Sequence, residues 1–423
     1  EAGPTSEDCL YLNVWTASLT GQRPVMVWIH GGAFRIGSGS MAVYDGTRFA
    51  QGGVVLVTLN YRLGRFGFFA HPALAAANPE DARGNYGLMD QVAALEWVKR
   101  NIAAFGGDPT NVTVFGESAG GSSVLHLLTS PKANRLFQKA IVESGGGHQI
   151  DRRLDSARGT REALTQQGVE WANSLGIASD AAALRSVPAD RVLGDGELSA
   201  GLNEVGPVID GEWVLADPGE RFAHGDFVKV PLLIGSNSYE ASVLAAFGSS
   251  ATRLLDGLGE QAAGLRAVYA GVAKDDTQLA DQAFGDSAFG SGARFVARSV
   301  AAQAQPAYLY HFDYVAEKRR GRVPGAGHGS EIPYVFDSTD KLPSIVQMFV
   351  TPEDVAMADT LNRYWINFAK TGDPNGSGLP HWPRYGADSD ELLLIRPKIE
   401  AVAHFRAPQL DFFQQRWEGA EAH

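Results

Sequence analysis

The sequence lacks several features that define other classes of protein. Of its 423 residues only one, Cys9, is a cysteine, so the chain shown can form neither an internal disulfide nor a metal site built from several cysteines. No stretch approaches the roughly 18 uninterrupted apolar residues that a membrane span needs. The apolar runs at 25–29 and 54–59 have only the length of strands. Internal repeats, low-complexity tracts and coiled-coil heptads are not found either.

Positive charge is also scarce. The chain carries 36 basic and 48 acidic residues, which gives a formal net charge of -12. Binding to nucleic acid requires clustered lysine and arginine, so we expect no nucleic-acid partner. The chain begins at Glu1 rather than at a methionine, as a protein does after removal of a signal peptide or of an N-terminal segment. The sequence therefore leaves the cellular location open, and it leaves the oligomeric state open as well.

The residues that are present predict an α/β fold. With 44% hydrophobic residues the chain can bury a large core. Short β-rich runs alternate with longer helical patterns, which is typical of a mostly parallel sheet flanked by helices. The runs that predict strands are 25–29, 54–59, 112–115, 140–142, 230–234 and 307–312.

Helices are predicted where apolar residues recur at steps of three and four. One such helix covers 88–105 and stops at the sequence Gly-Gly-Asp-Pro at 106–109. Another begins near Thr351, where a hydroxyl cap, a proline and two acids favour a helix N-terminus. Strand runs disappear at about 151–195 and 242–298, so we predict helical excursions there from one domain that spans 1–423.

The segment Gly116-Glu117-Ser118-Ala119-Gly120 follows a predicted strand and precedes a predicted helix. In that context the pattern Gly-x-Ser-x-Gly forces the serine onto a tight turn and exposes its hydroxyl at the helix N-terminus. Ser118 is therefore a candidate nucleophile. The same pattern is also typical of a serine that only forms a turn or caps a helix, so other features must decide.

A second glycine-rich segment, His30-Gly31-Gly32-Ala33-Phe34, follows the predicted strand at 25–29. Acyl transfer needs backbone N–H groups at the place where the carbonyl oxygen becomes anionic, and small residues let the substrate approach them. Such a loop cooperates with the N–H of the residue after the nucleophile, which here is Ala119. A glycine turn that merely ends a strand fits this segment equally well. Two such motifs in this order, each at a strand end, favour an acyl-transfer enzyme.

The general base should follow the nucleophile, since the expected chain order is serine, acid, histidine. His328 lies in the glycine-lined loop Gly327-His328-Gly329 beyond a predicted strand, where its imidazole can reach a neighbouring strand end. Surface or structural roles are the better interpretation for the other downstream histidines, which are His311, His381, His404 and His423. We therefore predict His328 as the base that accepts the serine proton.

The acid is less well defined by the sequence. Glu240 comes soon after the predicted strand at 230–234, and a carboxylate there can orient the imidazole and stabilise it as imidazolium. Asp210 and Asp217 are rivals, although both precede that strand. Glu331 is too close to His328 in the chain to be a natural partner, and we interpret it as a helix-start charge or a local ion pair.

Taken together, the chain resembles the type-B carboxylesterases of the α/β-hydrolases. The matching segments begin with Glu7-Asp8-Cys9-Leu10-Tyr11-Leu12-Asn13-Val14-Trp15, Trp28-Ile29-His30-Gly31-Gly32-Ala33-Phe34, Asn60-Tyr61-Arg62 and Gly84-Asn85-Tyr86-Gly87-Leu88-Met89-Asp90-Gln91. They continue with Ala104-Phe105-Gly106-Gly107-Asp108-Pro109, Phe115-Gly116-Glu117-Ser118-Ala119-Gly120-Gly121, His328-Gly329-Ser330-Glu331-Ile332-Pro333-Tyr334-Val335-Phe336 and Phe368-Ala369-Lys370-Thr371-Gly372-Asp373-Pro374-Asn375. The resemblance covers nearly the whole chain.

The resemblance implies an α/β-hydrolase fold with helical insertions near the active site, a small-molecule ester substrate, and neither a metal nor an organic cofactor. It implies that Ser118 is the nucleophile, that Glu240 is the acid and that His328 is the base. It also implies that oxyanion N–H groups lie at Gly32, Ala33 and Ala119. Alanine at the third oxyanion position is similar to the subgroup whose loop accepts bulky alcohol groups, including those of tertiary alcohols.

The chain departs from the family pattern in three places. The N-terminal strands that usually precede Glu7 are missing, and with them the usual disulfide partner of Cys9 and the segment that carries the choline-binding aromatic residue of cholinesterases. Tyr239 and Ala241 flank Glu240 where the family often has an acid and a glycine.

Two alternative functions remain for a chain with this fold. One is that of a catalytically silent binding protein, and the other is that of an enzyme of the same mechanism that cleaves thioesters, amides or carbamates.

Overall fold

A central β-sheet organises the molecule. The computed structural model describes residues 5–79, 83–194 and 205–421, and within these ranges nine strands form one sheet in the order β1-β3-β2-β4-β5-β8-β9-β10-β11. Only the pairs at the two edges, β1 with β3 and β10 with β11, are antiparallel. The prediction of an α/β fold with a mostly parallel sheet is confirmed.

The strands of this sheet are β1 (Leu12–Trp15), β2 (Arg23–Ile29), β3 (Val55–Leu59), β4 (Gly107–Glu117), β5 (Lys139–Glu143), β8 (Leu232–Asn237), β9 (Ala307–Phe312), β10 (Glu391–Ile395) and β11 (Glu400–Ala403). Two further strands, β6 (Arg152–Arg153) and β7 (Val208–Ile209), pair with each other outside it. All six predicted strands are present. The strand predicted at 230–234 begins two residues later than expected, and the one predicted at 112–115 begins at Gly107.

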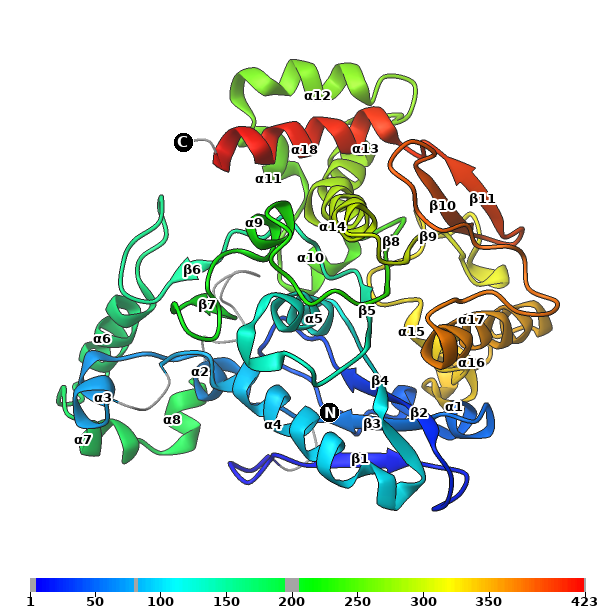
Figure 1. The fold of residues 1–423 in the computed structure, drawn as a ribbon. Coiled ribbons are helices and arrows are strands. Elements are labelled where there is room, and N and C mark those ends of the chain that lie inside the picture. Colours follow the sequence, from blue (N-terminus) through cyan, green and yellow to red (C-terminus); the bar gives the residue numbers. More distant parts are fainter. Residues whose placement is uncertain (1–4, 80–82, 195–204, 422–423) are drawn as a thin grey trace.

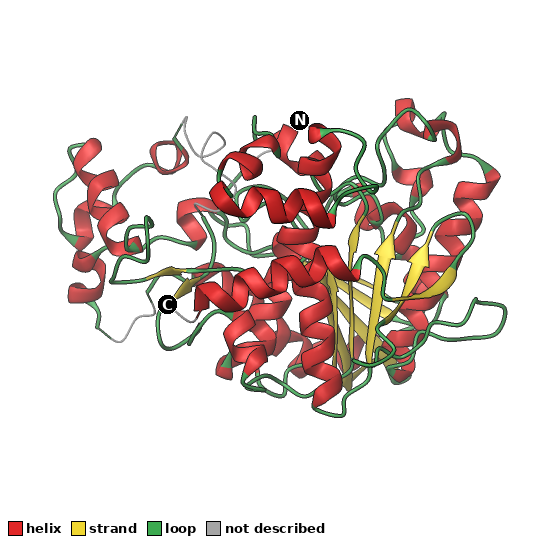
Figure 2. Cartoon of the chain, turned by 90° about the horizontal axis from the view of Figure 1, so that it is seen from above, coloured by secondary structure: helices red, strands yellow, loops and turns green. Residues whose placement is uncertain are grey.

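Helices cover both faces of the sheet, as Figures 1 and 2 show. One face is covered by α4 (Tyr86–Asn101), α5 (Ala119–Thr129), α9 (Pro218–Ala223) and α14 (Ser291–Ala302). The opposite face is covered by α1 (Thr47–Gln51), α15 (Ile332–Val335) and α17 (Pro352–Thr371).

Shorter helices connect these layers. Between the strands lie α2 (Gly64–Gly67), α3 (Pro72–Ala77), α6 (Leu164–Ser174), α7 (Ala181–Arg185), α8 (Ala189–Leu193), α10 (Ser242–Ala246), α11 (Thr252–Asp256), α12 (Ala262–Val268) and α13 (Asp276–Gly285). Near the C-terminus lie α16 (Ser344–Gln347) and α18 (Ala407–Glu421). The segment predicted as a helical excursion at 151–195 contains α6 to α8 and also the two-residue strand β6, and its residue 195 lies outside the described ranges. The one predicted at 242–298 contains α10 to α13 and most of α14, which extends to Ala302. That the chain forms one domain over 1–423 stays a prediction.

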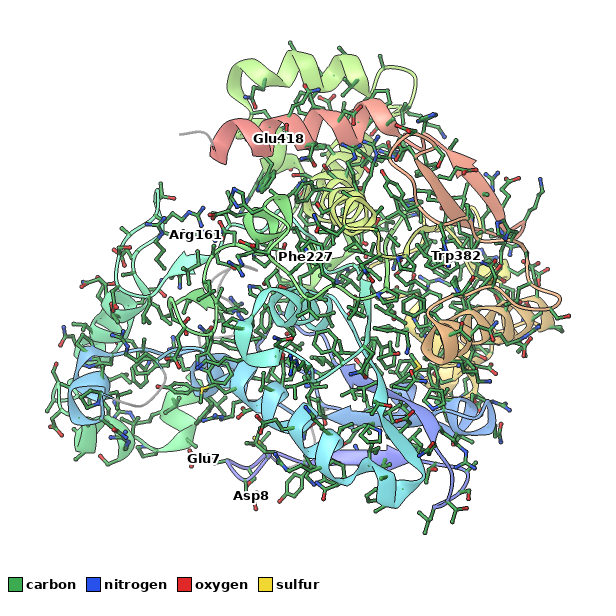
Figure 3. All side chains as sticks on the ribbon, viewed as in Figure 1. Glu7, Asp8, Arg161, Phe227, Trp382 and Glu418 are labelled. Carbon is green, nitrogen blue, oxygen red and sulfur yellow. The ribbon has the colours of Figure 1, made fainter. Side chains whose placement is uncertain are left out.

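The two faces of the sheet carry separate cores because successive side chains of a strand point to opposite sides. On β2, Val27 packs toward α4 and α5, whereas Trp28 packs toward α17. The second core is rich in aromatic rings, among them Trp382, which is labelled in Figure 3, is fully buried and donates its indole N–H to the carbonyl of Leu309 at 3.0 Å. Strands buried on both faces explain why their sequences are continuous apolar runs.

The helix predicted to begin near Thr351 is α17. Thr351 is its N-cap, and the Thr351 and Asp354 side chains form a reciprocal capping box with the backbone of the first turn. The predicted helix over 88–105 is also present, as α4 followed by a 3-10 turn over Ile102–Phe105 that ends at a left-handed Gly106. Within the described ranges, no helix has both the length and the apolar character to cross a membrane.

Candidate active site

The candidate nucleophile lies on a strained turn between β4 and α5. Ser118 has φ 57° and ψ -120°, a backbone conformation that side-chain-bearing residues rarely adopt, and its N–H donates to the carbonyl of Glu143 at 2.9 Å. Gly120 makes this turn possible, because a Cβ at that position would lie 1.9 Å from the carbonyl oxygen of Ile29. The turn therefore exposes Ser118 at the N-terminus of α5, and this helix can pack closely on β2.

The glycine-rich loop after β2 lies against this turn. Gly32 has φ 108°, and a Cβ there would lie 2.0 Å from the carbonyl oxygen of Ile36, so only glycine fits. Ala33 and Phe34 follow in left-handed conformations, with φ 55° and 60°. A Cβ at Gly31 would lie 3.1 Å from the Cβ of Ser118, which shows how closely the loop approaches the serine.

The backbone N–H groups of Gly32, Ala33 and Ala119 donate to no acceptor in the part of the chain that the structure describes. For Ala119 this follows from its place as the first residue of α5, since the first N–H groups of a helix have no partner within it. All three therefore remain able to donate to an oxygen atom that approaches Ser118.

His30 and Tyr61 pack against each other beside the glycine-rich loop that follows β2. The two rings stack with centroids 4.5 Å apart, and the Tyr61 hydroxyl donates to the carbonyl of His30 at 2.9 Å. Burial lowers the pKa of His30 to about 4, so this imidazole is neutral near pH 7 and acts as a structural element.

The structure brings His328 and Glu240 into direct contact although 88 residues separate them in the chain. The His328 Nδ1 and the Glu240 Oε2 are 2.5 Å apart. The other oxygen of Glu240 accepts hydrogen bonds from the N–H of Asn237 at 2.7 Å and from the hydroxyl of Ser144 at 2.6 Å. The N–H of His328 donates to the Ser242 hydroxyl at 2.8 Å. Both side chains are thus fixed by several elements, and Glu240 is fully buried.

The other imidazole nitrogen faces the nucleophile turn. The His328 Nε2 lies 3.2 Å from the Glu117 Oε1, and Glu117 directly precedes Ser118. This nitrogen is buried, and no hydrogen bond to it is formed within the described ranges. The imidazole therefore lies between the Glu240 carboxylate on one side and the turn that carries Ser118 on the other.

Three further glutamates lie buried beside this pair. Burial is the main cause that raises the pKa of Glu117 to about 7, of Glu331 to about 8, and of Glu143 well above its ordinary value. Burial alone would lower the pKa of His328, but the carboxylates of Glu117 and Glu240 outweigh it and raise that pKa. Perturbed pKa values of this kind cluster at functional sites.

The sequence did not identify this carboxylate cluster. Glu331 lies at the start of α15, as the sequence indicates, but its side chain is buried and accepts a hydrogen bond from the Asn237 amide on β8. Glu143 ends β5 and accepts from the Trp365 indole N–H at 2.8 Å. A glutamate at the end of a predicted buried strand was the available signal for Glu143, and position next to the serine was the signal for Glu117.

The rival acids lie elsewhere. Asp217 forms an ion pair with Arg158 at 2.5 Å, and Asp210 accepts a hydrogen bond from the Asn85 amide at 2.8 Å. His311, the downstream histidine within a predicted strand, is half-buried on β9, and desolvation lowers its pKa to about 3. Within the described residues, no group of three or more histidine, cysteine or acidic side chains has the arrangement of a metal site.

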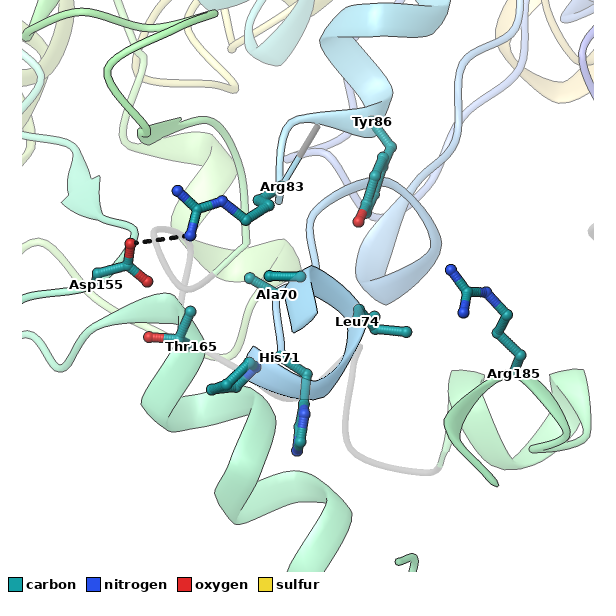
Figure 4. A pocket seen from close by; sticks show the side chains of 10 residues that line it. Ala70, His71, Leu74, Arg83, Tyr86, Asp155, Thr165 and Arg185 are labelled. Carbon is teal, nitrogen blue, oxygen red and sulfur yellow. Dashed lines mark hydrogen bonds and ion pairs between the residues drawn. The ribbon is translucent and has the colours of Figure 1, made fainter. Parts of the chain in front are cut away.

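A pocket of about 160 Å³ lies apart from these residues, between α3 and the helices of the first excursion (Figure 4). Its walls include Ala70, His71, Tyr86 and two arginines, Arg83 and Arg185, of which Arg83 forms an ion pair with Asp155 at 3.4 Å. None of the predicted site residues contributes to its lining.

Comparisons with known proteins show what the chain is similar to. The model of the carboxylesterase family matches residues 1–413. The chain is 36% identical to the fumonisin B1 esterase of Sphingopyxis macrogoltabida, over 91% of this chain and 72% of that protein. It is also 36% identical to the para-nitrobenzyl esterase of Bacillus subtilis, over 93% of this chain and 80% of that protein. The crystal structure of a Geobacillus stearothermophilus carboxylesterase superimposes with a TM-score of 0.84 at 36% identity, covering 97% of this chain and 86% of that one.

Proposed function

The chain belongs to the carboxylesterase family and is a carboxylic-ester hydrolase, and from this premise we propose that it cleaves esters through an acyl-enzyme on Ser118. In this proposal His328 is the general base, Glu240 is the acid that orients it, and the N–H groups of Gly32, Ala33 and Ala119 form the oxyanion hole. The substrate is a small carboxylic ester.

One observation carries the proposal, the hydrogen bond between the His328 Nδ1 and the Glu240 carboxylate. A neutral imidazole that donates from Nδ1 leaves the lone pair of Nε2 free to accept a proton. That nitrogen faces the turn that carries Ser118, through its 3.2 Å approach to Glu117. The strained conformation of Ser118 and the unpaired N–H groups around it support the same chemistry.

The reaction follows from these positions. His328 takes the hydroxyl proton as the Ser118 oxygen attacks the ester carbonyl, and the resulting oxyanion accepts hydrogen bonds from the three N–H groups. The C–O bond to the alcohol then breaks, and the alcohol leaves with the proton from His328. Water, deprotonated by His328 in turn, attacks the acyl-enzyme and releases the carboxylic acid.

The test is a panel of p-nitrophenyl esters of increasing acyl length. Ser118→Ala should lower kcat more than about a thousandfold, because residues of a catalytic triad act as a unit. Glu240→Gln should lower kcat too, since an amide cannot stabilise the imidazolium. Ser122→Ala, one turn further along α5, is the matched control and should keep its activity. Hydrolysis by Ser118→Ala at the wild-type rate would refute the assignment of the nucleophile.

We further propose that the enzyme accepts esters of bulky alcohols. Ala33 is only partly buried and has the smallest side chain that still carries a Cβ, so the oxyanion loop takes up little space near the ester. Hydrolysis of tert-butyl acetate, compared with n-butyl acetate and with Ser118→Ala as blank, tests this point. Turnover of the n-butyl ester without any turnover of the tert-butyl ester would exclude it.

A further inference from the structure

A π-helical turn interrupts one long helix beside the catalytic residues. Helix α13 continues without a break through the π turn Asp286–Gly290 into α14. A π turn accommodates one additional residue, which rotates the side chains after it by about 100° relative to those before it. Such turns occur often at functional sites.

One side chain of this π turn, Phe289, packs on His328. The two ring centroids are 5.1 Å apart and the ring planes are inclined by 39°. Phe289 is itself half-buried, and its ring also packs on Phe284, with the two ring centroids 6.2 Å apart. Among the aromatic side chains of the described residues, Phe289 is the one that contacts this imidazole.

The helix that contains the π turn also lies against Glu240, the hydrogen-bond partner of His328. A Cβ at Gly285, the last residue of α13, would lie 3.4 Å from the Cβ of Glu240, which is ordinary van der Waals distance. The helix therefore packs on Glu240 through Gly285, directly before the π turn, and on His328 through Phe289 within it.

Contacts from distant parts of the chain hold the π turn in place. The buried carboxylate of Asp286 accepts hydrogen bonds from the Tyr269 hydroxyl and from the Nε of Arg406, the latter at 3.1 Å. Directly after the turn, the Ser291 hydroxyl donates to the carbonyl of Leu410 at 3.0 Å. The position of Phe289 is thus set by Tyr269, which follows α12, and by the C-terminal segment, not by its own helix alone.

The imidazole needs such support. Its hydrogen bond to Glu240 fixes one edge of the ring, and its Nε2 lies 3.2 Å from the Glu117 Oε1 without forming a hydrogen bond within the described ranges. These two contacts lie at the ring edge, so the tilt of the ring also depends on what packs against its face. A displacement of about 1 Å in a reacting group can cost on the order of a hundredfold in rate. A rigid ring against the imidazole face limits this tilt.

We propose that Phe289 is a positioning residue, which the π turn presents to His328 so that the imidazole stays aligned with Ser118. This inference rests on the proposed function, because it assumes that His328 is the base. Phe289 acts through His328 and need not touch the reacting atoms.

The experiment compares kcat and KM of three variants on p-nitrophenyl acetate. Phe289→Ala should lower kcat about 10- to 100-fold, whereas KM should stay within about twofold, because ground-state binding does not use the alignment of the base. Phe289→Leu, which still covers part of the ring face, should recover most of kcat. Phe295→Ala is the control, since this ring lies on α14 and packs on His148 and Trp417, with centroids 5.2 and 5.1 Å away.

A structural role alone would give a different pattern. In that case Phe289→Ala and Phe295→Ala would lower the melting temperature and leave kcat of the folded enzyme at the wild-type value. Wild-type kcat in folded Phe289→Ala, or a loss confined to KM, would overturn the inference. Ser118→Ala and His328→Ala separate the two proposals. If both variants stay active, the proposed function fails, whereas if both are inactive and Phe289→Ala is not impaired, only the positioning role fails.

Discussion

At the scale of single residues, Glu117 has an unusual place. Its neighbour in the chain is the proposed nucleophile, and its carboxylate lies 3.2 Å from the Nε2 of His328. It is buried, and burial raises its own pKa to about 7. Near neutral pH this side chain therefore changes charge beside the imidazole that must itself be neutral to act as a base.

We expect Glu117→Gln to extend activity to lower pH. The carboxylate favours the imidazolium form, so its removal lowers the pKa of His328, and the imidazole then stays neutral at more acidic pH. The acid limb of the profile of kcat/KM against pH should move to lower pH by about one unit or more, which is the size of shift that a charge at this distance causes. Because the groups titrate together, the measured value belongs to the cluster.

The control for this measurement is Glu96→Gln, which changes an exposed glutamate on α4 that pairs with Arg100. It alters the net charge of the protein by the same amount, and its pH profile should match that of the wild type. A shift of the acid limb to higher pH in Glu117→Gln would contradict the assigned electrostatic role.

At the scale of secondary-structure elements, α17 shows how a local signal determines a boundary. Its N-cap was predicted from Thr351 and the residues after it, and the structure has the capping box there. Thr351 donates its N–H to the Asp354 carboxylate at 2.8 Å, and the Thr351 hydroxyl accepts from the Asp354 N–H. This helix packs on β2 and β4, so its first turn anchors one layer of the fold.

Thr351→Ala should therefore destabilise the protein by about 0.5–2 kcal/mol, the usual cost of losing an N-cap side chain. The midpoint of urea unfolding measures this change. Thr360→Ala, in the interior of the same helix, removes a threonine hydroxyl without removing a cap, and it should be neutral or slightly stabilising. Equal destabilisation by both substitutions would mean that the capping box contributes nothing.

The elements that were predicted from the sequence are those with a strong local signal. The central strands are buried on both faces and therefore read as continuous apolar runs, as β2 and β5 do. Three strands of the sheet, β1, β10 and β11, were not predicted. The edge strands β1 and β11 have only four residues each and are partly exposed, whereas β10 is a buried apolar run whose signal was overlooked. The π turn at Asp286–Gly290 has no recognisable sequence signal, since its conformation depends on partners as distant as Arg406.

At the scale of the whole molecule, the candidate site also combines local motifs, which a sequence can reveal, with contacts that form only in the folded chain. The turn at Ser118 and the loop at Gly32 are local motifs, so the sequence could identify them. The contact between Glu240 and His328 bridges 88 residues, and the carboxylate cluster draws Glu117, Glu143 and Glu331 from three different elements. Which distant carboxylates meet is a property of the folded sheet, because the carboxyl ends of its parallel strands share one edge.

This cluster should also make the stability of the whole protein depend on pH. Burial raises the pKa of Glu143 above its ordinary value of 4.5, and it raises that of Glu331 to about 8. A carboxyl group with a raised pKa in the folded state stabilises the fold fully below about pH 4.5, and it loses this contribution as the pH rises through the folded value. Each such group can change the free energy of unfolding by up to about 1.4 kcal/mol per pH unit.

Glu143→Gln tests this dependence. The amide keeps an oxygen that can accept from the Trp365 indole, but it cannot ionise, so the loss of stability between pH 5 and pH 8.5 should be smaller than in the wild type. Urea midpoints at both pH values measure the difference, with Glu391→Gln at the partly exposed start of β10 as control. A wild-type slope in Glu143→Gln would mean that this carboxyl ionises in the folded protein as readily as in the unfolded chain.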